Sequence, residues 1–406
     1  MTSNNETEQK IAPPLRFPDF QAEPEWCNAS LSDLIQTITP PKKLQTFQYK
    51  EDGLFPIVDQ SPHQSCGRTD DKAAVISKPL PVIVFGDHTC VLKLVDKPFV
   101  QGADGIKIFA GTDGLATNFL FQSLSANPVS SESYKRHFTK LKRQCVFYPA
   151  NGIAEQDRIA SCLGSLDALI AAEGRKLEAL RAHKKGLTQQ LFPREGETRP
   201  RRRFPEFDDG SEWKNVRLEE VARLQNGYAF KSKTYVDQGE YGIVTIGNVQ
   251  QGRLSDDSMN TINVPPEDLQ DHHYLSDGDI LVSMTGNVGR VCRVEGKNFL
   301  LNQRVGKILP TDVDADFLYF ALFQDNFLKA MKEEAAGGAQ GNISAATIRE
   351  YEFLIPLDRN EQVMVANCLA AVDHLERSAL YGNKLLQTFK HGLMQQLFPS
   401  SEDVAS

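Results

Sequence analysis

The sequence KKGLTQQLFP at Lys184–Pro193 returns almost unchanged as KHGLMQQLFP at Lys390–Pro399. The two strings lie 206 positions apart, and chance repetition of ten residues is negligible. An internal duplication is therefore the first hypothesis to test, because a repeated unit determines the architecture of the whole chain.

The duplication extends through most of the chain. RFPDF at Arg16–Phe20 returns as RFPEF at Arg203–Phe207, an offset of 187. The offset grows along the chain, as small insertions in one copy would cause. The remaining matches are Trp26 with Trp213 (offset 187), Gly86, Val91, Lys97, Phe99, Lys107 and Ile108 with Gly286, Val291, Lys297, Phe299, Lys307 and Ile308 (offset 200), and Glu155, Gln156, Cys162, Leu163 and Asp167 with Glu361, Gln362, Cys368, Leu369 and Asp373 (offset 206).

Length and composition are those of a globular protein. The chain has 406 residues, enough for several domains, with 40% hydrophobic and 24% charged residues. Seven cysteines without a C-x-x-C pair indicate reduced thiols in a cytoplasmic protein. The N-terminal residues lack the apolar region of a secretory signal, and no apolar stretch is long enough to predict a membrane span.

The net charge of −8 is unevenly distributed. Residues 1–193 carry 22 basic and 21 acidic residues, and the remainder carries 23 and 32. A protein that grips phosphates unaided is usually basic, so a simple DNA-binding monomer is disfavoured.

Both repeated tails predict long helices with a coiled-coil seam. Apolar residues recur every 3.5 positions over more than four heptads, and prolines bound both segments. Lys184 and Lys390 occupy equivalent polar positions that would fix register. The simplest way to bury the apolar seam of each helix is to pack it against the other helix, although two separate core helices would also satisfy the pattern. The seams are Ile159, Leu163, Leu166, Ile170, Glu173, Leu177, Leu180, Lys184, Leu187 and Leu191, and Val365, Leu369, Val372, Glu376, Ala379, Asn383, Leu386, Lys390, Leu393 and Leu397.

The front part of each copy is predicted to be a mixed α+β domain. PVIVFGD, CVLKLVD and GIKIFAG in the first copy, and GDILVSM, RVCRVEG and VGKILP in the second, are typical of strands. DADFLYFALFQDNFLKAMKEEAAGG predicts one helix, with Asp before it and glycines after it. The expected segments are an N-terminal segment (1–20), a domain (21–150), a helix (151–193), a basic linker (194–212), a second domain (213–357), a second helix (358–399) and a tail (400–406).

Motifs for catalysis and metal binding are missing from the sequence. There is no phosphate-binding loop, no nucleophile elbow and no histidine–cysteine cluster at metal-ligand spacing. Together these absences favour a binding protein over an enzyme. The arginines of the linker, Arg199 and Arg201–Arg203, are either a solvated connector or phosphate contacts.

With both tails in place, the chain resembles the specificity subunit of type I restriction–modification enzymes. The resemblance covers nearly all of residues 15–399 and rests on the alternation of variable domain and long helix. It also rests on the motifs GLxQQLFP, PLDRNEQ, GDILVSMTGNVG, LNQRVGKILP and GGAQGNIS, and on FGDHTCVLKLVDKPFVQGADGIKIF in the first copy. One departure is YPANGIAEQ, which precedes the first helix where the second copy has IPLDRNEQ.

This resemblance implies a non-catalytic subunit that reads a bipartite double-stranded DNA target, one half-site per domain, with the spacer set by antiparallel helices related by a pseudo-twofold axis. It would assemble with two modification (methyltransferase) subunits and with restriction (helicase–nuclease) subunits. S-adenosylmethionine, ATP and Mg would then belong to those partners, and no metal or cofactor to this chain. About 33 residues of seam give a helix of about 50 Å at ~1.5 Å per residue, and half-sites one turn apart lie ~34–36 Å from each other.

Base-reading residues are predicted from side-chain type and from their place beside the matched strands. Arginine pairs with guanine, and asparagine or glutamine with adenine, in the major groove. A solvated polar residue is the alternative at each position. Two other classes of protein also remain open, a coiled-coil scaffold without DNA and an enzyme with an unrecognised site. The candidates are Gln64, Arg68, Lys72, His88, Gln101, Asn248, Asn287, Arg290, Arg304, Gln340 and Asn342.

Overall fold

The computed structural model describes residues 12–399 except 104, 132–135, 209 and 338–340. The chain divides into two compact units: unit 1 is Met1–Arg175 with Leu380–Ser406, and unit 2 is Lys176–Ala379. The boundaries fall inside the two long helices. The compact units therefore cut across the linear order of domain and helix expected from the sequence.

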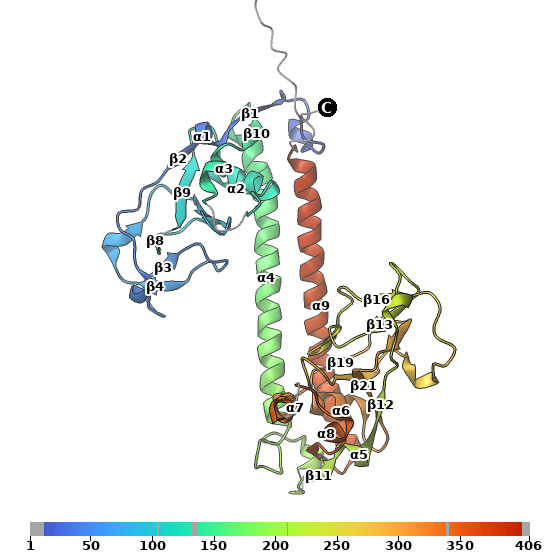
Figure 1. Cartoon of the computed structure of the whole chain (residues 1–406). Helices are drawn as coiled ribbons and strands as arrows, with labels where there is room; N and C mark the ends of the chain where they lie inside the picture. Colours follow the sequence, from blue (N-terminus) through green and yellow to red (C-terminus); the bar gives the residue numbers. More distant parts are fainter. Residues whose placement is uncertain (1–11, 104, 132–135, 209, 338–340, 400–406) are drawn as a thin grey trace, which may run out of the picture. The chain divides into compact units, whose positions relative to one another are not determined.

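The two long helices are α4 (Ile153–Leu191) and α9 (Arg359–Leu397), as the periodicity predicts (Figure 1). Within each unit their halves are antiparallel. In unit 1, Lys390 Nζ lies 2.6 Å from Asp167 Oδ1. In unit 2 the equivalent residues exchange helices, and Lys184 pairs with Asp373. The polar seam lysines thus have reciprocal partners, which fixes the register of both halves.

Unit 1 contains two four-stranded sheets in addition to its segments of the long helices. A two-stranded ribbon, β1 (Trp26–Ser30) with β10 (Cys145–Pro149), joins them to α4. Short helices α1 (Leu31–Leu34), α2 (Thr117–Ala126) and α3 (Phe138–Lys142) complete the domain. The sheets have the orders β2 (Ile35–Thr37), β9 (Ile106–Gly111), β6 (Val82–Gly86), β7 (Leu92–Val95), and β4 (Gly67–Thr69), β3 (Phe55–Val58), β8 (Phe99–Gln101), β5 (Val75–Ile76).

Unit 2 repeats this topology strand for strand. Its ribbon is β11 (Lys214–Arg217) with β22 (Glu352–Ile355), and a hairpin of β14 (Val249–Gln250) and β15 (Arg253–Leu254) is added. Its helices are α5 (Leu218–Val221), α6 (Ala315–Leu322), α7 (Asp325–Gly337) and α8 (Ala345–Arg349). The sheets are β12 (Ala222–Asn226), β21 (Val305–Pro310), β18 (Ile280–Ser283), β19 (Val291–Arg293), and β16 (Asn260–Ile262), β13 (Tyr241–Val244), β20 (Phe299–Leu301), β17 (Tyr274–Leu275).

Strand register corrects one of the sequence matches. Gly86 N–H donates to the Val91 carbonyl in unit 1, and Ser283 N–H donates to the Arg290 carbonyl in unit 2, so Ser283 is the structural counterpart of Gly86. Gly286 instead lies beyond the end of β18. The offset of 200 holds for β8, where Val100 pairs with Ile57 as Leu300 pairs with Ile243. The equivalent backbone bonds give an offset of 197 at the end of β6 and of 199 at β7 and β9, because the connection from Ser283 to Arg290 is longer than that from Gly86 to Val91.

The helix predicted after Asp314 is interrupted in the structure. Asp314 Oδ1 accepts the backbone N–H of Phe317 at 2.9 Å, which caps α6 as expected. The helix ends at Leu322, and α7 begins anew at Asp325. At the break, the Gln251 side chain donates to the Phe323 carbonyl, and the Gln324 side chain donates to that of Ala321.

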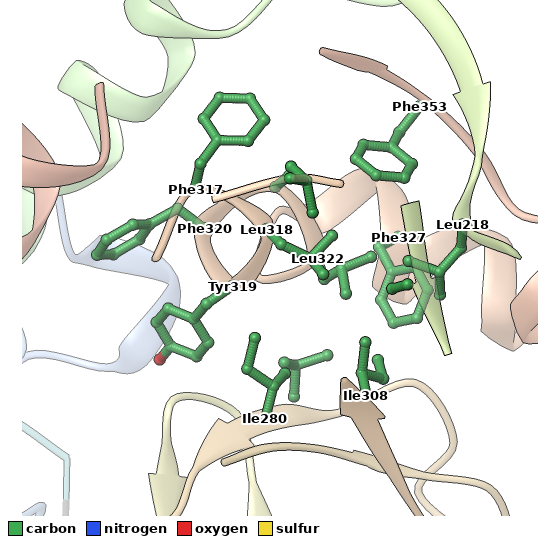
Figure 2. Packing of buried hydrophobic residues seen from close by; sticks show 14 of the residues in the cluster. Leu218, Ile280, Ile308, Phe317, Leu318, Tyr319, Phe320, Leu322, Phe327 and Phe353 are labelled. Atoms are coloured by element: carbon green, nitrogen blue, oxygen red, sulfur yellow. The ribbon is translucent and has the colours of Figure 1, made fainter. Parts of the chain in front are cut away.

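The core of unit 2 lies between its first sheet and α6. Figure 2 shows Leu318 and Leu322 of α6 above Ile280 and Ile308, which project from strands β18 and β21. Phe317 is fully buried on the same helix. Each such side chain contributes about 1.5–3 kcal/mol by leaving water, so this layer accounts for the stability of the domain.

A buried arginine–glutamate–tryptophan group recurs in both units. In unit 2, Arg203 Nε donates to Glu361 Oε1 at 2.7 Å, and Trp213 Nε1 donates to the same oxygen at 3.2 Å. In unit 1, Arg16, Glu155 and Trp26 make the same contacts at 2.7 and 3.4 Å. The duplicated RFP, Trp and Glu-Gln motifs therefore form one structural group, which joins each domain to the start of a long helix.

Three of the four linker arginines have carboxylate partners within unit 2. Arg203 is 7% exposed and its partner Glu361 1%, so Arg203 cannot contact a phosphate and that alternative is wrong for it. Arg199 pairs with Asp208 and Arg201 with Glu197, both at the surface. Arg203 differs from Arg199 and Arg201 because it is buried, and a guanidinium away from water must be paired with a carboxylate.

Replacing Arg203 by methionine should lower the free energy of unfolding by about 3–5 kcal/mol, because Glu361 would be left buried without its cation. The measurement is urea denaturation followed by tryptophan fluorescence. Arg201→Met is the matched control and should change stability by less than ~1 kcal/mol, since its pair with Glu197 is exposed. Equal effects of the two substitutions would contradict the structural role.

Candidate nucleic-acid interface

In unit 2, three segments far apart in sequence meet at the end of strand β18. The backbone N–H of Met284 donates to the Arg304 carbonyl at 3.1 Å, and its carbonyl accepts from Ile343 at 3.0 Å. Ser283 N–H donates to the Arg290 carbonyl at 3.0 Å. These bonds place the loops around Arg290, Arg304 and Asn342 side by side. The sequence predicted these residues separately, and the fold brings them together.

Arg290 is the best-positioned cation of this group. Its Nη1 donates to Gln250 Oε1 at 2.6 Å, so the side chain is held against the β14–β15 hairpin. The neighbouring Gln251 accepts the Val291 N–H at 3.0 Å and ties the hairpin to strand β19. One amide oxygen satisfies only part of a guanidinium, which has five N–H donors. Arg290 therefore retains donors for a base or phosphate.

The loop between β18 and β19 packs closely against α7. Gly289 has φ +76°, and a Cβ there would lie 2.6 Å from Cβ of Met331 in α7. Only glycine fits this close approach without a shift of the helix. The Ser283 hydroxyl donates to the Asn287 carbonyl and closes the loop. Asn287 itself is exposed, so a rigid loop presents its amide to solvent.

Asn342 and Arg304 complete the surface at the end of β18. Arg304 is exposed. Asn342 forms a β-bridge with Thr285, and its Oδ1 is buried with no hydrogen-bond partner among the residues that the structure describes. Gln340, predicted beside it, lies outside the described residues.

Unit 1 has the same convergence at the end of strand β6. Asp87 replaces Met284: its N–H donates to the Gly105 carbonyl at 2.7 Å, and its own carbonyl accepts from His137 N–H at 2.8 Å. The Asp87 carboxylate also accepts the Phe138 N–H, which caps α3. His88 follows directly and is half-buried. Of the five residues predicted in unit 1, His88 is the one at this junction.

The other predicted residues of unit 1 lie on its second sheet. Arg68 is exposed on β4 and donates to the Gly53 and Leu54 carbonyls. Gln64 and Lys72 are exposed in the connections on either side of β4. Gln101 is buried at the end of β8.

Asn248 has a structural position in unit 2. It is buried, and its Oδ1 accepts from the Thr245 N–H and hydroxyl at 3.0 and 2.7 Å. Its Nδ2 donates to the Ser255 carbonyl at 3.0 Å. With both ends of the amide bonded inside the turn, its side chain has little left to offer a base.

Sequence reasoning missed three residues at these junctions. Gln250 positions Arg290. In unit 1, a Cβ on Gly105 would lie 2.9 Å from the Gln60 amide, so Gln60 packs at the junction. Arg136 is exposed directly before His137, where unit 2 has Asn342 before Ile343. Only alignment of the two copies by strand register reveals Arg136, because the loop sequences differ.

Charge beneath the surface is neutralised locally. Lys93 Nζ donates to the Asp59 carbonyl at 2.8 Å, and burial lowers the pKa of this lysine although Asp59 partly restores it. In unit 2, Lys307 Nζ lies 2.6 Å from Asp279 Oδ2. Such lysines support strands, whereas the exposed Arg136 and Arg304 and the half-buried Arg290 are cations that the loops can offer to DNA.

Comparisons with known proteins agree with this architecture. A family profile described as "Type I restriction modification DNA specificity domain" matches residues 210–381. The specificity subunit of the type I restriction enzyme MjaVIII from Methanocaldococcus jannaschii is 23% identical over 395 residues, covering 89% of this chain and 88% of that protein. The crystal structure of a type I restriction–modification S subunit from M. genitalium superposes with a TM-score of 0.70 at 16% identity, covering 96% of this chain and all of that one.

The fold and its matches define a class, the DNA-specificity subunits of restriction–modification systems. Within that class the resemblance noted from the sequence is confirmed: residues 210–381 match the family profile, and the chain is similar along most of its length to a type I specificity subunit. The predicted fold, with two mixed domains and two long helices, is confirmed as well. Within the described residues, no helix is both long and apolar enough to cross a bilayer.

Replacing Arg290 by alanine should relax discrimination at one base position by roughly 1–3 kcal/mol, because a positioned guanidinium would lose its base contacts. The measurement is binding of the assembled complex to target duplexes that differ at single positions. Arg217→Ala, at an exposed pair with Glu352 on the ribbon, is the control and should leave the preference unchanged. Equal loss of affinity for target and random DNA would remove Arg290 from the reading residues.

Proposed function

We propose that this chain reads a bipartite DNA target, with one half-site contacted by each unit. The support comes from the duplicated junctions: β6 and β18 end in the same backbone bonding pattern, with loops of different sequence around it. A repeated scaffold gives two readers with one geometry. Different loop residues give each reader its own base sequence, since bases are read by side chains rather than by the frame.

The proposal assigns catalysis to partners of the chain. Two modification subunits would carry S-adenosylmethionine and methylate adenine, and restriction subunits would carry ATP and Mg and cleave DNA. The chain would act in the cytoplasm, where these partners meet DNA. Its net charge of −8 favours this division, because a partner that closes round the duplex can supply phosphate contacts that this chain lacks.

The long helices are proposed to set the spacer between half-sites. Each helix has residues in both units, and its seam lysine and aspartate are paired in different units. Asp167 and Lys184 of α4 therefore belong to separate ion pairs, one in each unit. The same holds for Asp373 and Lys390 of α9. The helical segment between the two ion pairs would then determine, by its length, the distance between the DNA-reading domains.

The half-site assignment can be tested by giving the chain two identical readers. Leu31 N–H donates to Gln144 O at 2.9 Å, and Leu218 N–H donates to Tyr351 O at 3.0 Å, so residues 31–144 and 218–351 are matched modules. Replacing the first module by a copy of the second should convert the target into an inverted repeat. Phe317 would then occupy the position of Phe119, which packs against Trp26.

The measurement is mapping of methylated adenines after co-expression with the modification subunits. The half-site of unit 2 should persist and appear twice. The reverse exchange is the control and should duplicate the other half-site. A target in which neither original half-site survives would refute independent reading.

The spacer is tested by lengthening both helices at equivalent positions. Inserting four alanine-rich residues after Lys176 in α4 and after its counterpart Gly382 in α9 leaves both lysine–aspartate pairs intact. Each insertion adds about 6 Å at 1.5 Å per residue, and base pairs are about 3.4 Å apart. The mapped spacer should grow by one or two base pairs, with both half-sites unchanged. An insertion in α4 alone is the control, and methylation with the original spacer in the double insertion would exclude the helices as the determinant.

A further inference from the structure

Arg290 is a half-buried arginine whose partner is a neutral amide rather than a carboxylate. Its Nη1 donates to Gln250 Oε1 at 2.6 Å, and no carboxylate pairs with it among the residues that the structure describes. Arg203, by comparison, is buried against Glu361. A carboxylate offsets the charge of a guanidinium, whereas an amide directs the side chain and leaves its charge in place. The positive charge of Arg290 therefore remains available to a ligand.

The amide of Gln250 is fixed in one orientation by its two partners. Its Nε2 donates to the Gly247 carbonyl at 2.6 Å, while its Oε1 accepts from Arg290. A carbonyl can only accept and a guanidinium can only donate, so the two ends of the amide cannot exchange places. The Gly247 carbonyl itself lies in a turn that the buried Asn248 side chain closes by accepting from Thr245. Gln250 therefore holds the guanidinium from a fixed position.

The β14–β15 hairpin that carries Gln250 is attached to strand β19 and to the end of α6. Gly252 N–H donates to the Val291 carbonyl at 2.8 Å, and Gln251 accepts the Val291 N–H at 3.0 Å. The Gln251 amide also donates to the Phe323 carbonyl at 3.0 Å. A Cβ at Gly252, where φ is +79°, would lie 2.9 Å from a carbon of the Phe323 ring, so the turn packs directly on this ring. A side chain that orients another needs such rigid support.

The free edge of the Arg290 guanidinium determines what the residue can recognise. With Nη1 bonded to Gln250, Nε and Nη2 form an edge whose donors have no partner among the described residues. Two parallel N–H donors match the O6 and N7 acceptors that guanine presents side by side in the major groove. Adenine presents an N–H donor beside its N7, which would face an N–H of the arginine. The geometry therefore selects guanine.

Unit 1 differs from unit 2 in both parts of this arrangement. The backbone bond that Ser283 makes to the Arg290 carbonyl is made in unit 1 by Gly86 to the Val91 carbonyl, so a valine stands where unit 2 has the arginine. The part of unit 1 that the structure describes has no counterpart of the β14–β15 hairpin. The arginine and its support thus occur together in one copy of the duplicated fold and are missing together from the other, as expected of residues that act as a pair.

We infer that Arg290 reads a guanine in the half-site of unit 2 and that Gln250 is its positioning residue. The inference rests on the proposed function, because it assumes a bipartite DNA target. Gln250 touches no base; it holds Nη1 so that the edge of Nε and Nη2 is presented to the major groove. An arginine without that support would sample several rotamers, and its donors would meet phosphates as readily as bases. Discrimination at one base pair is therefore set by Gln250, although Arg290 makes the contact.

The test uses variants of Gln250 in the chain assembled with its modification subunits. The target is mapped from methylated adenines, and module exchange assigns one half-site to unit 2. Binding is then measured to duplexes that carry each base pair in turn at every position of that half-site. Gln250→Ala and Gln250→Met remove the acceptor, the second while keeping the length of the side chain. Gln250→Glu keeps an acceptor but adds a negative charge. Arg253→Ala, in the same hairpin at an exposed pair with Asp257, is the control.

The wild-type complex should prefer a G·C pair at one position by roughly 5- to 150-fold, the range of a bidentate base contact. Gln250→Ala and Gln250→Met should remove most of that preference and leave the other positions and the binding to random duplexes unchanged. Gln250→Glu should weaken binding to every duplex but keep the preference, because its carboxylate still orients Arg290. Arg253→Ala should keep the preference as well. A residue needed only for folding would instead lower binding at all positions in every Gln250 variant.

Arg290→Lys tests the fork itself, since a lysine keeps the charge but presents no pair of parallel donors. It should lose the same preference as Gln250→Ala. Three outcomes overturn the inference: a half-site of unit 2 without a required G·C pair, a preference that survives in both Gln250→Ala and Gln250→Met, or an Arg290→Lys variant that loses affinity equally for target and random DNA, which would make Arg290 a phosphate contact. Failure of the wild-type complex to methylate a bipartite target would refute the proposed function instead, and this result is distinct from the other three.

Discussion

Each unit depends on one tryptophan that connects the start of one long helix to the end of the other. In unit 1, Trp26 donates to Glu155 near the beginning of α4, and its ring lies 6.4 Å from that of Phe398 after α9. In unit 2, Trp213 donates to Glu361 of α9 and packs 5.7 Å from Phe192 after α4. Each of the two long helices, α4 and α9, therefore begins in the core of one unit and ends in the core of the other. The string GLxQQLFP is repeated because its phenylalanine fills the same aromatic pocket in both units.

This arrangement separates what must be preserved from what can vary. The tryptophan, its arginine–glutamate pair and the lysine–aspartate seam pairs are buried or half-buried and recur in both copies. Residues at the ends of β6 and β18 keep their backbone hydrogen bonds but differ in side chain, since a backbone bond does not constrain the residue type that carries it.

The acidic net charge is consistent with this division of roles. Several cations that look available in sequence are used internally, as Arg203 is by Glu361, Lys307 by Asp279 and Lys390 by Asp167. Arg136 and Arg304 remain exposed beside the candidate loops. Under the proposed function, these loops would read bases with a small number of positioned groups, and partner subunits would supply further phosphate contacts.

The sequence by itself determined the duplication, the two long helices and most of the strands, because burial imposes periodicity that a single chain displays. The 3.5-residue pattern identified the seam, and the strand prediction around Ile280 and Ile308 needed only short apolar runs between turns. Asp314 was recognisable as a helix cap, but the break at Phe323 was not, and the Phe323 carbonyl there is bonded by Gln251, a residue 72 positions away. The sequence also named Arg290, Arg304 and Asn342 without showing that they meet, and it could not detect Gln250 or Arg136. Only the tertiary structure decided which exposed residues share a surface and which arginines are buried, because proximity between distant segments is set by strand register and core packing, which leave no local pattern in the chain.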